Sequence, residues 1–132
     1  MVNREDSRPP AAHLLGRKVE SFNESDRTAT LSFEAVEAFT NRHGTVQGGF
    51  LAAMLDSAAA NAVLPALPAD TTAVTTRLDT RFRSPARVGT IKASSRVVEA
   101  TDKSALVEAQ LSDLEGVVVA SASIEFRLLR RR

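Results

Sequence analysis

The sequence predicts an α+β fold in which an antiparallel sheet of five to six strands wraps around one long central helix. A segment from about Gly48 to Val63 is alanine-rich and apolar on nearly every side, which is typical of a buried helix. Four segments of alternating apolar and polar residues follow it, joined by short links as in antiparallel neighbours. Because a sheet must cover its apolar face and only one long helix is available, we expect the sheet to curl around that helix.

Shorter elements are expected before the helix. Residues 1–12 are polar and contain two adjacent prolines, which predicts a loose N-terminal arm. Residues 17–35 contain two short extended segments, and the second of them alternates as a half-buried strand does. A short turn of helix and a loop are expected over residues 36–45.

Proline ends the central helix at "PALPAD", because it cannot continue a helix. Four strands are then expected over residues 73–83, 91–97, 105–111 and 118–128. In the first of them, simple alternation places Val74 on the same face as Leu78 and Phe82. The same alternation places Thr75 on the other face, with the arginines.

Composition limits the possible functions. The chain has 132 residues, which suits one domain over residues 1–132, and its net charge of +1 calls for no nucleic acid or acidic partner. Without cysteine and with only two histidines, we expect no metal site and no redox cofactor. Asp56 and Asn61 interrupt the most apolar stretch, so no membrane span is expected. The start lacks the apolar run of a secretory signal, which predicts a cytoplasmic location.

One motif resembles a known family. Asn41 is followed by Gly44-Thr45-Val46-Gln47-Gly48-Gly49, and Asp56 stands seven residues beyond the second glycine of the pair. This pattern resembles the signature of hotdog-fold acyl-CoA thioesterases, near the phenylacetate-pathway and 4-hydroxybenzoyl-CoA branch. The segments "AVTTRLDTRFRSPARVG" and "DLEGVVVASASIEF" are similar to that family's later strands, and the likeness covers about residues 28–128. It implies a hotdog fold and hydrolysis of a small-molecule acyl-CoA.

The motif departs from the family at one position. Many relatives have histidine directly before the glycine pair, whereas this chain has Gln47. Glutamine donates and accepts hydrogen bonds but does not titrate near neutral pH. Gln47 is therefore expected to position a group rather than to transfer a proton.

The spacing within the helix predicts a shared site. Asp56 lies eight residues after Gly48, which is about 12 Å along the axis and about 80° around it. One thioester cannot contact both residues on a single helix, but two antiparallel helices could bring one copy's Gly48 beside the other's Asp56. We therefore expect at least a homodimer, and the resemblance adds that such dimers usually pair into tetramers.

The resemblance implies a role for each motif residue. The backbone N–H of Gly48, at the positive end of the helix dipole, would hold the thioester oxygen. Asp56 would either attack the carbonyl carbon or activate water, and the sequence leaves both open. Asn41 and Thr75 would orient water or the carboxylate by hydrogen bonding.

Two further groups are candidates for substrate binding. Apolar side chains near the glycine pair suggest an acyl pocket, and arginines around the Ser84-Pro85 turn suit the phosphates of coenzyme A. The candidate residues of the acyl pocket are Gly49, Phe50, Met54 and Leu55. The candidate phosphate-binding residues are Arg81, Arg83 and Arg87.

Other interpretations stay open. Asp56 could belong to a structural polar network, Gly48 could serve close packing, Asn41 could cap a turn, and the arginines could form a solvated face. A non-catalytic acyl-CoA-binding module would keep the same groove. A hydratase or dehydratase of the same fold would need a histidine, for which His43 is the candidate.

Overall fold

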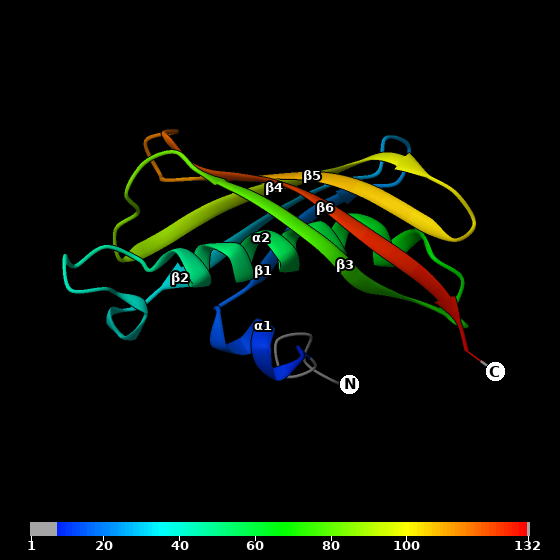
Figure 1. Cartoon of the computed structure of the whole chain (residues 1–132), viewed down its shortest axis with the longest axis horizontal. Helices are drawn as coiled ribbons and strands as arrows, with labels where there is room; N and C mark the ends of the chain where they lie inside the picture. The colour runs from blue at the N-terminus through cyan, green and yellow to red at the C-terminus, as the bar shows by residue number, and fades with distance from the viewer. Residues whose placement is uncertain (1–7, 132) are drawn as a thin grey trace.

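A six-stranded antiparallel sheet arches over one long helix in the computed structural model, which describes residues 8–131 (Figure 1). The strand order across the sheet is β1-β2-β4-β5-β6-β3. This is the predicted α+β arrangement. In chain order the elements are α1 (Pro10–Leu14), β1 (Lys18–Asn23), β2 (Thr28–Ala35), η1 (Glu37–Phe39), α2 (Gly48–Val63), η2 (Leu64–Ala66), β3 (Thr71–Phe82), β4 (Gly89–Ala100), β5 (Ser104–Ser112) and β6 (Val118–Arg130).

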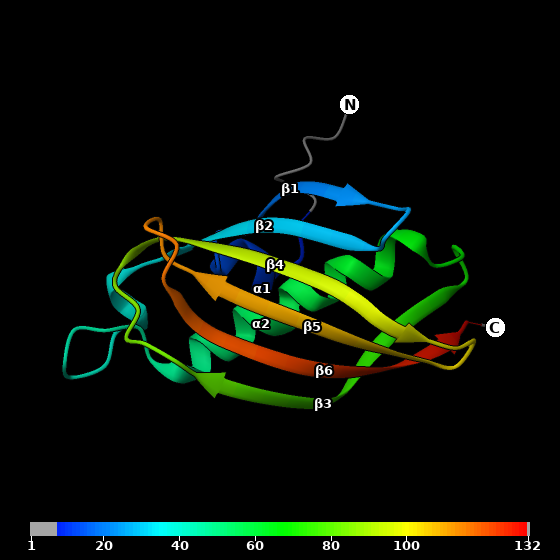
Figure 2. The same ribbon diagram turned by 90° about the horizontal axis from the view of Figure 1, so that it is seen from above.

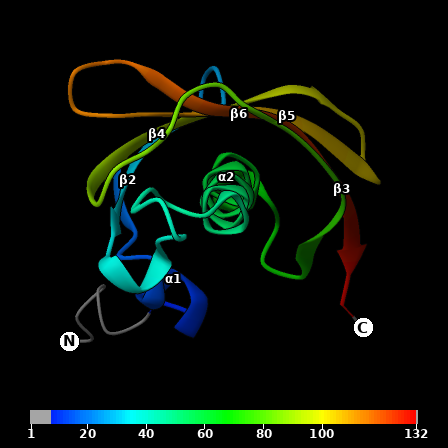
Figure 3. The same cartoon turned by 60° about the vertical axis from the view of Figure 1, so that its left-hand side comes forward.

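Helix α2 begins and ends where the sequence predicts. The sheet curves around it, as Figure 3 shows along the helix axis. The Oγ of Ser95 on β4 is buried and donates a 2.7 Å hydrogen bond to the carbonyl oxygen of Ala58, which fixes the middle of the helix to the sheet. The helical side chains buried against the sheet are Leu51, Met54, Leu55, Ala58, Ala59, Ala62 and Val63.

One side of α2 is not covered by the sheet. Gly49 and Ala53 are exposed there, and Asp56 and Ala60 are only partly buried. The expectation of a helix buried on all sides is therefore wrong for this side of the protomer. By length and composition alone, the segment Gly48–Ala66 could cross a membrane. In the fold it is the central helix, and packing against the concave face of the sheet accounts for its apolar character.

Strand β3 forms one edge of the sheet, beside β6 (Figure 2). The pairing register shifts between Thr75, which lies opposite Phe126, and Arg77, which lies opposite Glu125, so Thr76 is an extra residue in a β-bulge. Because successive side chains alternate between faces, one extra residue reverses the alternation. The predicted faces are therefore wrong for Val74 and Thr75.

The register of β6 gives the corrected faces of β3. Phe126, Ile124, Ala122 and Ala120 of β6 are buried against the helix side of the sheet. Their partners on β3, which share that concave face, are Thr75, Leu78, Thr80 and Phe82. The residues on the convex face are Val74, Arg77, Asp79 and Arg81.

The N-terminal segment is more ordered than the sequence predicts. Part of the predicted arm, residues 1–7, lies outside the described residues. Residues 10–12 are not loose but belong to helix α1, and Ala12 and Leu15 are buried. Gly16 follows with φ = +63°, and a Cβ at this position would lie 2.9 Å from the Cβ of Glu34. Glycine is needed for this turn because it permits both the backbone angle and the close approach to β2.

Candidate active site

Asp56 lies on the uncovered side of α2, and its carboxylate accepts a hydrogen bond from β3. The Oγ1 of Thr75 donates to Oδ1 of Asp56 over 2.7 Å. The bulge at Thr76 makes this bond possible, because it turns Thr75 toward the helix rather than toward the convex face. Two of the residues that the sequence analysis placed in the site, Asp56 and Thr75, are thus in direct contact.

The first turn of α2 presents backbone donors. Gln47 is the N-cap, and its side chain makes no capping hydrogen bond. Its carbonyl oxygen accepts from the N–H of Phe50 at 3.0 Å. Among residues 8–131, no acceptor is found for the N–H of Gly48 or Gly49. Free N–H groups at a helix N-terminus, together with the helix dipole, favour a negatively charged or polarised oxygen.

Gly48 and Gly49 differ in their surroundings. A Cβ on Gly48 would lie 3.1 Å from Cζ of Phe82, so the ring of Phe82 stands directly beside the helix start. A Cβ on Gly49 would meet no atom within 4 Å. The approach to the first N–H groups is therefore bounded on one side by an aromatic ring and open beside Gly49.

Asn41 organises the loop that leads into α2. Its Oδ1 accepts from the N–H of His43 at 2.9 Å and from the N–H of Thr45 at 3.3 Å, and its Nδ2 donates to Oγ1 of Thr45 at 3.1 Å. Gly44 takes φ = +78° in the same turn. The side chain of Asn41 thus holds the loop in shape, and it makes no hydrogen bond to Asp56 within the protomer. His43 and Gln47 are exposed.

The predicted acyl-pocket residues lie in different places. Met54 and Leu55 have 0% exposed surface and belong to the core between α2 and the sheet. Phe50 is partly buried and stacks on Phe39, with ring centroids 4.3 Å apart. Of the four predicted acyl-pocket residues, only Gly49 is exposed, and it lies beside the helix start.

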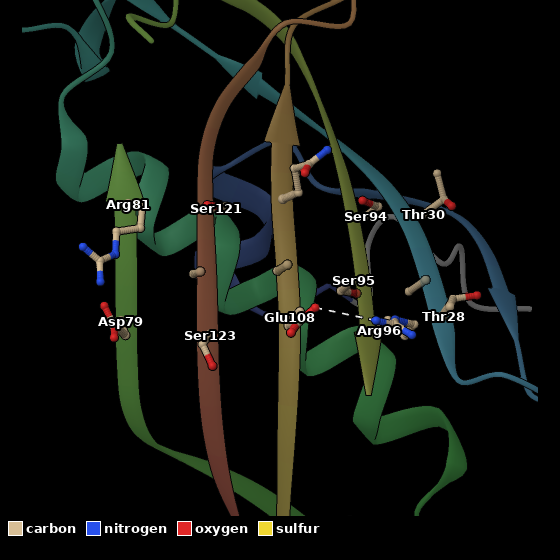
Figure 4. Close-up of a pocket in the computed structure, with 14 residues that line it drawn as sticks. Thr28, Thr30, Asp79, Arg81, Ser94, Ser95, Arg96, Glu108, Ser121 and Ser123 are labelled. Atoms are coloured by element: carbon tan, nitrogen blue, oxygen red, sulfur yellow. Dashed lines mark ion pairs between the residues drawn. The ribbon is translucent and has the colours of Figure 1, made fainter. Parts of the chain in front are cut away.

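The predicted phosphate-binding arginines lie mostly on the other side of the sheet. Arg81 and Asp79 border a groove of about 670 Å³ on the convex face, where Arg96 and Glu108 form a 3.6 Å ion pair (Figure 4). The groove is rich in the hydroxyl side chains of Thr28, Thr30, Ser94, Ser121 and Ser123. Nε of Arg83 donates to Oγ of Ser121 at 3.2 Å, and Arg87 is exposed in the link to β4. In the protomer, Arg81 is therefore separated from Asp56 by the sheet.

Two residues that the sequence analysis did not select contact the site. Phe82 stands beside Gly48, and Arg17 donates from Nη1 to Oγ of Ser57, the neighbour of Asp56, at 3.0 Å. Burial, followed by the nearby guanidinium of Arg8, lowers the pKa of Arg17 below its ordinary value. Arg17 stands in an ordinary polar stretch, so no sequence pattern identifies it.

Among residues 8–131, no group of three or more His, Cys, Asp or Glu side chains gathers to hold a metal ion.

The fold and the motif define the class of protein. The family model of the Thioesterase superfamily matches residues 43–127, and the chain belongs to that superfamily. This confirms the resemblance carried by residues 41–56. Membership supports thioester hydrolysis as the general class of reaction. No curated protein matches the chain.

Solved structures agree with the family. A phenylacetic acid degradation-related protein of Ralstonia eutropha JMP134 is 30% identical, and the match covers 94% of each chain with a TM-score of 0.89. A Bacillus halodurans protein crystallised with CoA is 25% identical over 76% of this chain and 66% of that one, with a TM-score of 0.73. The Escherichia coli PaaI protein, from the phenylacetic acid degradation operon, shares the fold at 19% identity, with coverage of 94% and 87% and a TM-score of 0.84.

The bond between Thr75 and Asp56 predicts a measurable effect on thioester cleavage. Thr75→Val removes the donor at nearly constant volume, and we expect kcat to fall roughly tenfold to a hundredfold, the usual range for a hydrogen bond to a charged group. Thr75→Ser keeps the hydroxyl and should retain most activity. Thr72→Val, on the same strand but the other face, is the matched control. Equal turnover by Thr75→Val and wild type would show that the bond has no part in the reaction.

Proposed function

We propose that this protein hydrolyses acyl-CoA thioesters in two equivalent sites, each shared between two copies of the chain. One copy supplies the carboxylate of Asp56 and the other supplies the N–H of Gly48. The observation that carries the proposal is the placement of these groups along one edge strand. Asp56 is bonded to Thr75 near the start of β3, and Gly48 lies beside Phe82 at its end.

The outer edge of β3 is suited to pairing with a second copy. An edge strand presents unpaired N–H and C=O groups, and β3 is a 12-residue edge strand in which most side chains are exposed. Along β3, Asp79 lies three rungs of the ladder from Thr75 and three rungs from Phe82, as counted by their partners on β6. Antiparallel pairing of two β3 strands about Asp79 would therefore set Thr75 of one copy opposite Phe82 of the other.

This pairing would bring the reacting groups together. Asp56 is hydrogen-bonded to Thr75, and Gly48 lies beside Phe82, so the pairing of Thr75 with Phe82 also sets the positions of Asp56 and Gly48. A two-fold axis at Asp79 would thus place the carboxylate of each copy opposite the helix start of the other. A second copy would also face the uncovered side of each α2. Assembly of two such dimers into a tetramer stays a prediction from the family resemblance.

The chemistry follows from the two groups. The N–H of Gly48 would donate to the thioester carbonyl oxygen, where negative charge develops as the carbon becomes tetrahedral. Asp56 would either attack that carbon, releasing CoA and leaving an anhydride that water cleaves, or take a proton from the water that attacks it. Both routes convert the thioester and one water molecule into a free acid and CoA. Thr75 would hold one carboxylate oxygen and leave the other for the reaction.

The remaining motif residues would assist. Asn41 keeps the loop before α2 in shape, and Gln47 offers an amide beside the helix start. Of the predicted arginines, Arg87 is exposed in the link after β3 and would meet the phosphates of CoA, whereas Arg83 is hydrogen-bonded to Ser121 on the convex face. The CoA seen with the Bacillus halodurans neighbour supports a ligand of this type.

Replacement of the carboxylate tests the reaction. Asp56→Asn keeps the size of the side chain and an oxygen that can accept from Thr75, but it removes the nucleophile or base. We expect kcat for a panel of acyl-CoAs to fall about 10²–10⁴-fold, with an unchanged circular dichroism spectrum. Asp102→Asn, in the exposed β4–β5 turn, removes the same charge and should leave kcat unaltered.

Unaltered turnover by Asp56→Asn would contradict the assignment. Acyl-CoA binding without thiol release by the wild type would identify a binding module instead. Addition of water to an enoyl-CoA, lost in a His43→Asn variant, would identify a hydratase.

Disulfide cross-linking tests the pairing of the two copies. The natural chain has no cysteine, so a single introduced cysteine can react only with its counterpart. A residue on the axis faces itself, with Cα atoms about 4.5–5.5 Å apart, within the range that a disulfide spans. We expect Asp79→Cys to form covalent dimers on mild oxidation. Val74→Cys, on the same strand and face, would lie about 25 Å from its counterpart and should stay monomeric on a denaturing gel. Equal cross-linking of the two variants would contradict the register.

A further inference from the structure

Phe82 is exposed to a degree that is unusual for a phenylalanine in this fold. Phe82 is 56% exposed, whereas Phe33, Phe39 and Phe126 are at most 3% exposed. Phe22 and Phe50 are partly buried. Burial of an aromatic side chain stabilises a fold, so an exposed ring forgoes stabilisation in the protomer. Its position on the concave face, next to the helix start, suggests that something covers it in the functional state.

The ring of Phe82 lies directly against Gly48, whose N–H takes part in the proposed reaction. Cζ and Cε1 of Phe82 lie 3.1 and 3.2 Å from the position that a Cβ on Gly48 would occupy. The tip of the ring therefore fills the space that a side chain at position 48 would need. The N–H of Gly48 is the proposed donor to the thioester carbonyl oxygen. An acyl group bound there would therefore contact the ring through the first few atoms next to the carbonyl.

We propose that Phe82 is a specificity-determining residue whose ring forms a wall of the acyl-binding site. This inference rests on the proposed function, because it takes the N–H of Gly48 as the donor to the thioester oxygen. With two β3 strands paired about Asp79, the ring would also lie opposite Thr75 of the second copy. It would then stand between the amide of one copy and the carboxylate of the other. The carbons next to the carbonyl would pack on the ring, so its contribution grows with the size of the acyl group.

The ring could instead serve only the contact between the two copies. In that case its removal would weaken the dimer and would affect all substrates alike. An acyl wall predicts a different pattern, in which the oligomer persists and the loss depends on the acyl group. Acetyl-CoA offers only a methyl group to the ring, whereas hexanoyl-CoA offers a chain.

The test compares Phe82→Ala with Val74→Ala, a variant of an apolar residue of similar exposure on the other face of β3. Light scattering establishes the oligomeric state of each variant. For Phe82→Ala we expect kcat/KM to fall about tenfold for hexanoyl-CoA, a loss of about 1.4 kcal/mol, and less than twofold for acetyl-CoA. Val74→Ala should change neither value. Phe82→Leu keeps apolar bulk and should give an intermediate loss, which preserves the test if the alanine variant does not fold.

Three results would overturn the proposal: equal losses for both acyl groups, no loss for either, or dissociation into monomers. Calorimetry in the Asp56→Asn background measures acyl-CoA binding without turnover and separates this proposal from the proposed function. Weaker hexanoyl-CoA binding by Asp56→Asn/Phe82→Ala supports the wall even if the wild type cleaves nothing. If the wild type hydrolyses acyl-CoA and Phe82→Ala keeps the same acyl preference, only the proposed role of Phe82 as a wall of the acyl-binding site is contradicted. A chain that neither binds nor cleaves hexanoyl-CoA contradicts both.

Discussion

The unpaired outer edge of β3 is the constraint on which the candidate site depends. This strand lies at the border of the sheet and beside the uncovered side of α2, so two neighbouring surfaces have no partner within residues 8–131. Asp56 and Gly48 border those surfaces at opposite ends of β3, too far apart along one helix to contact a single thioester. A two-fold pairing of β3 edges would cover both surfaces and would create two complete sites at once.

Two local features of the backbone prepare this arrangement. The extra residue at Thr76 reverses the alternation of β3, so that Thr75 faces the helix and donates to Asp56. The missing side chain at Gly48 leaves room for the ring of Phe82 and keeps the first N–H groups of α2 accessible. Neither feature adds a reactive group. The bulge orients the hydroxyl of Thr75, which a regular strand would direct to the convex face. Gly48 keeps the helix N–H groups accessible beside Phe82, which a side chain at position 48 would prevent.

Much of this could be predicted from the sequence, because the strongest signals are periodic. The apolar run predicts the bounds of α2 and alternation predicts the strands, whereas the shared site that the spacing of Gly48 and Asp56 indicates stays a prediction. The bulge at Thr76 escaped prediction because an inserted residue leaves local alternation intact on either side of it. The burial of Met54 and Leu55 depends on which side of α2 the sheet covers, and the contact of Phe82 with Gly48 joins distant segments, so a linear pattern shows neither.

The most direct test of shared sites is complementation between two inactive variants. Gly48 is the first residue of α2, where a helix accepts proline and loses only the N–H, and the extended backbone of Gln47 (φ −62°, ψ 138°) suits a following proline. The proline ring requires the tip of the Phe82 side chain in the same copy to shift, because a Cβ at position 48 would lie 3.1 Å from its Cζ. Asp56→Asn and Gly48→Pro should each be inactive alone. Refolded together in equal amounts, half of the dimers would be mixed and would hold one intact site, so about a quarter of wild-type activity should return. A mixture with no recovered activity, although mixed dimers form, would show that each site is built within one chain.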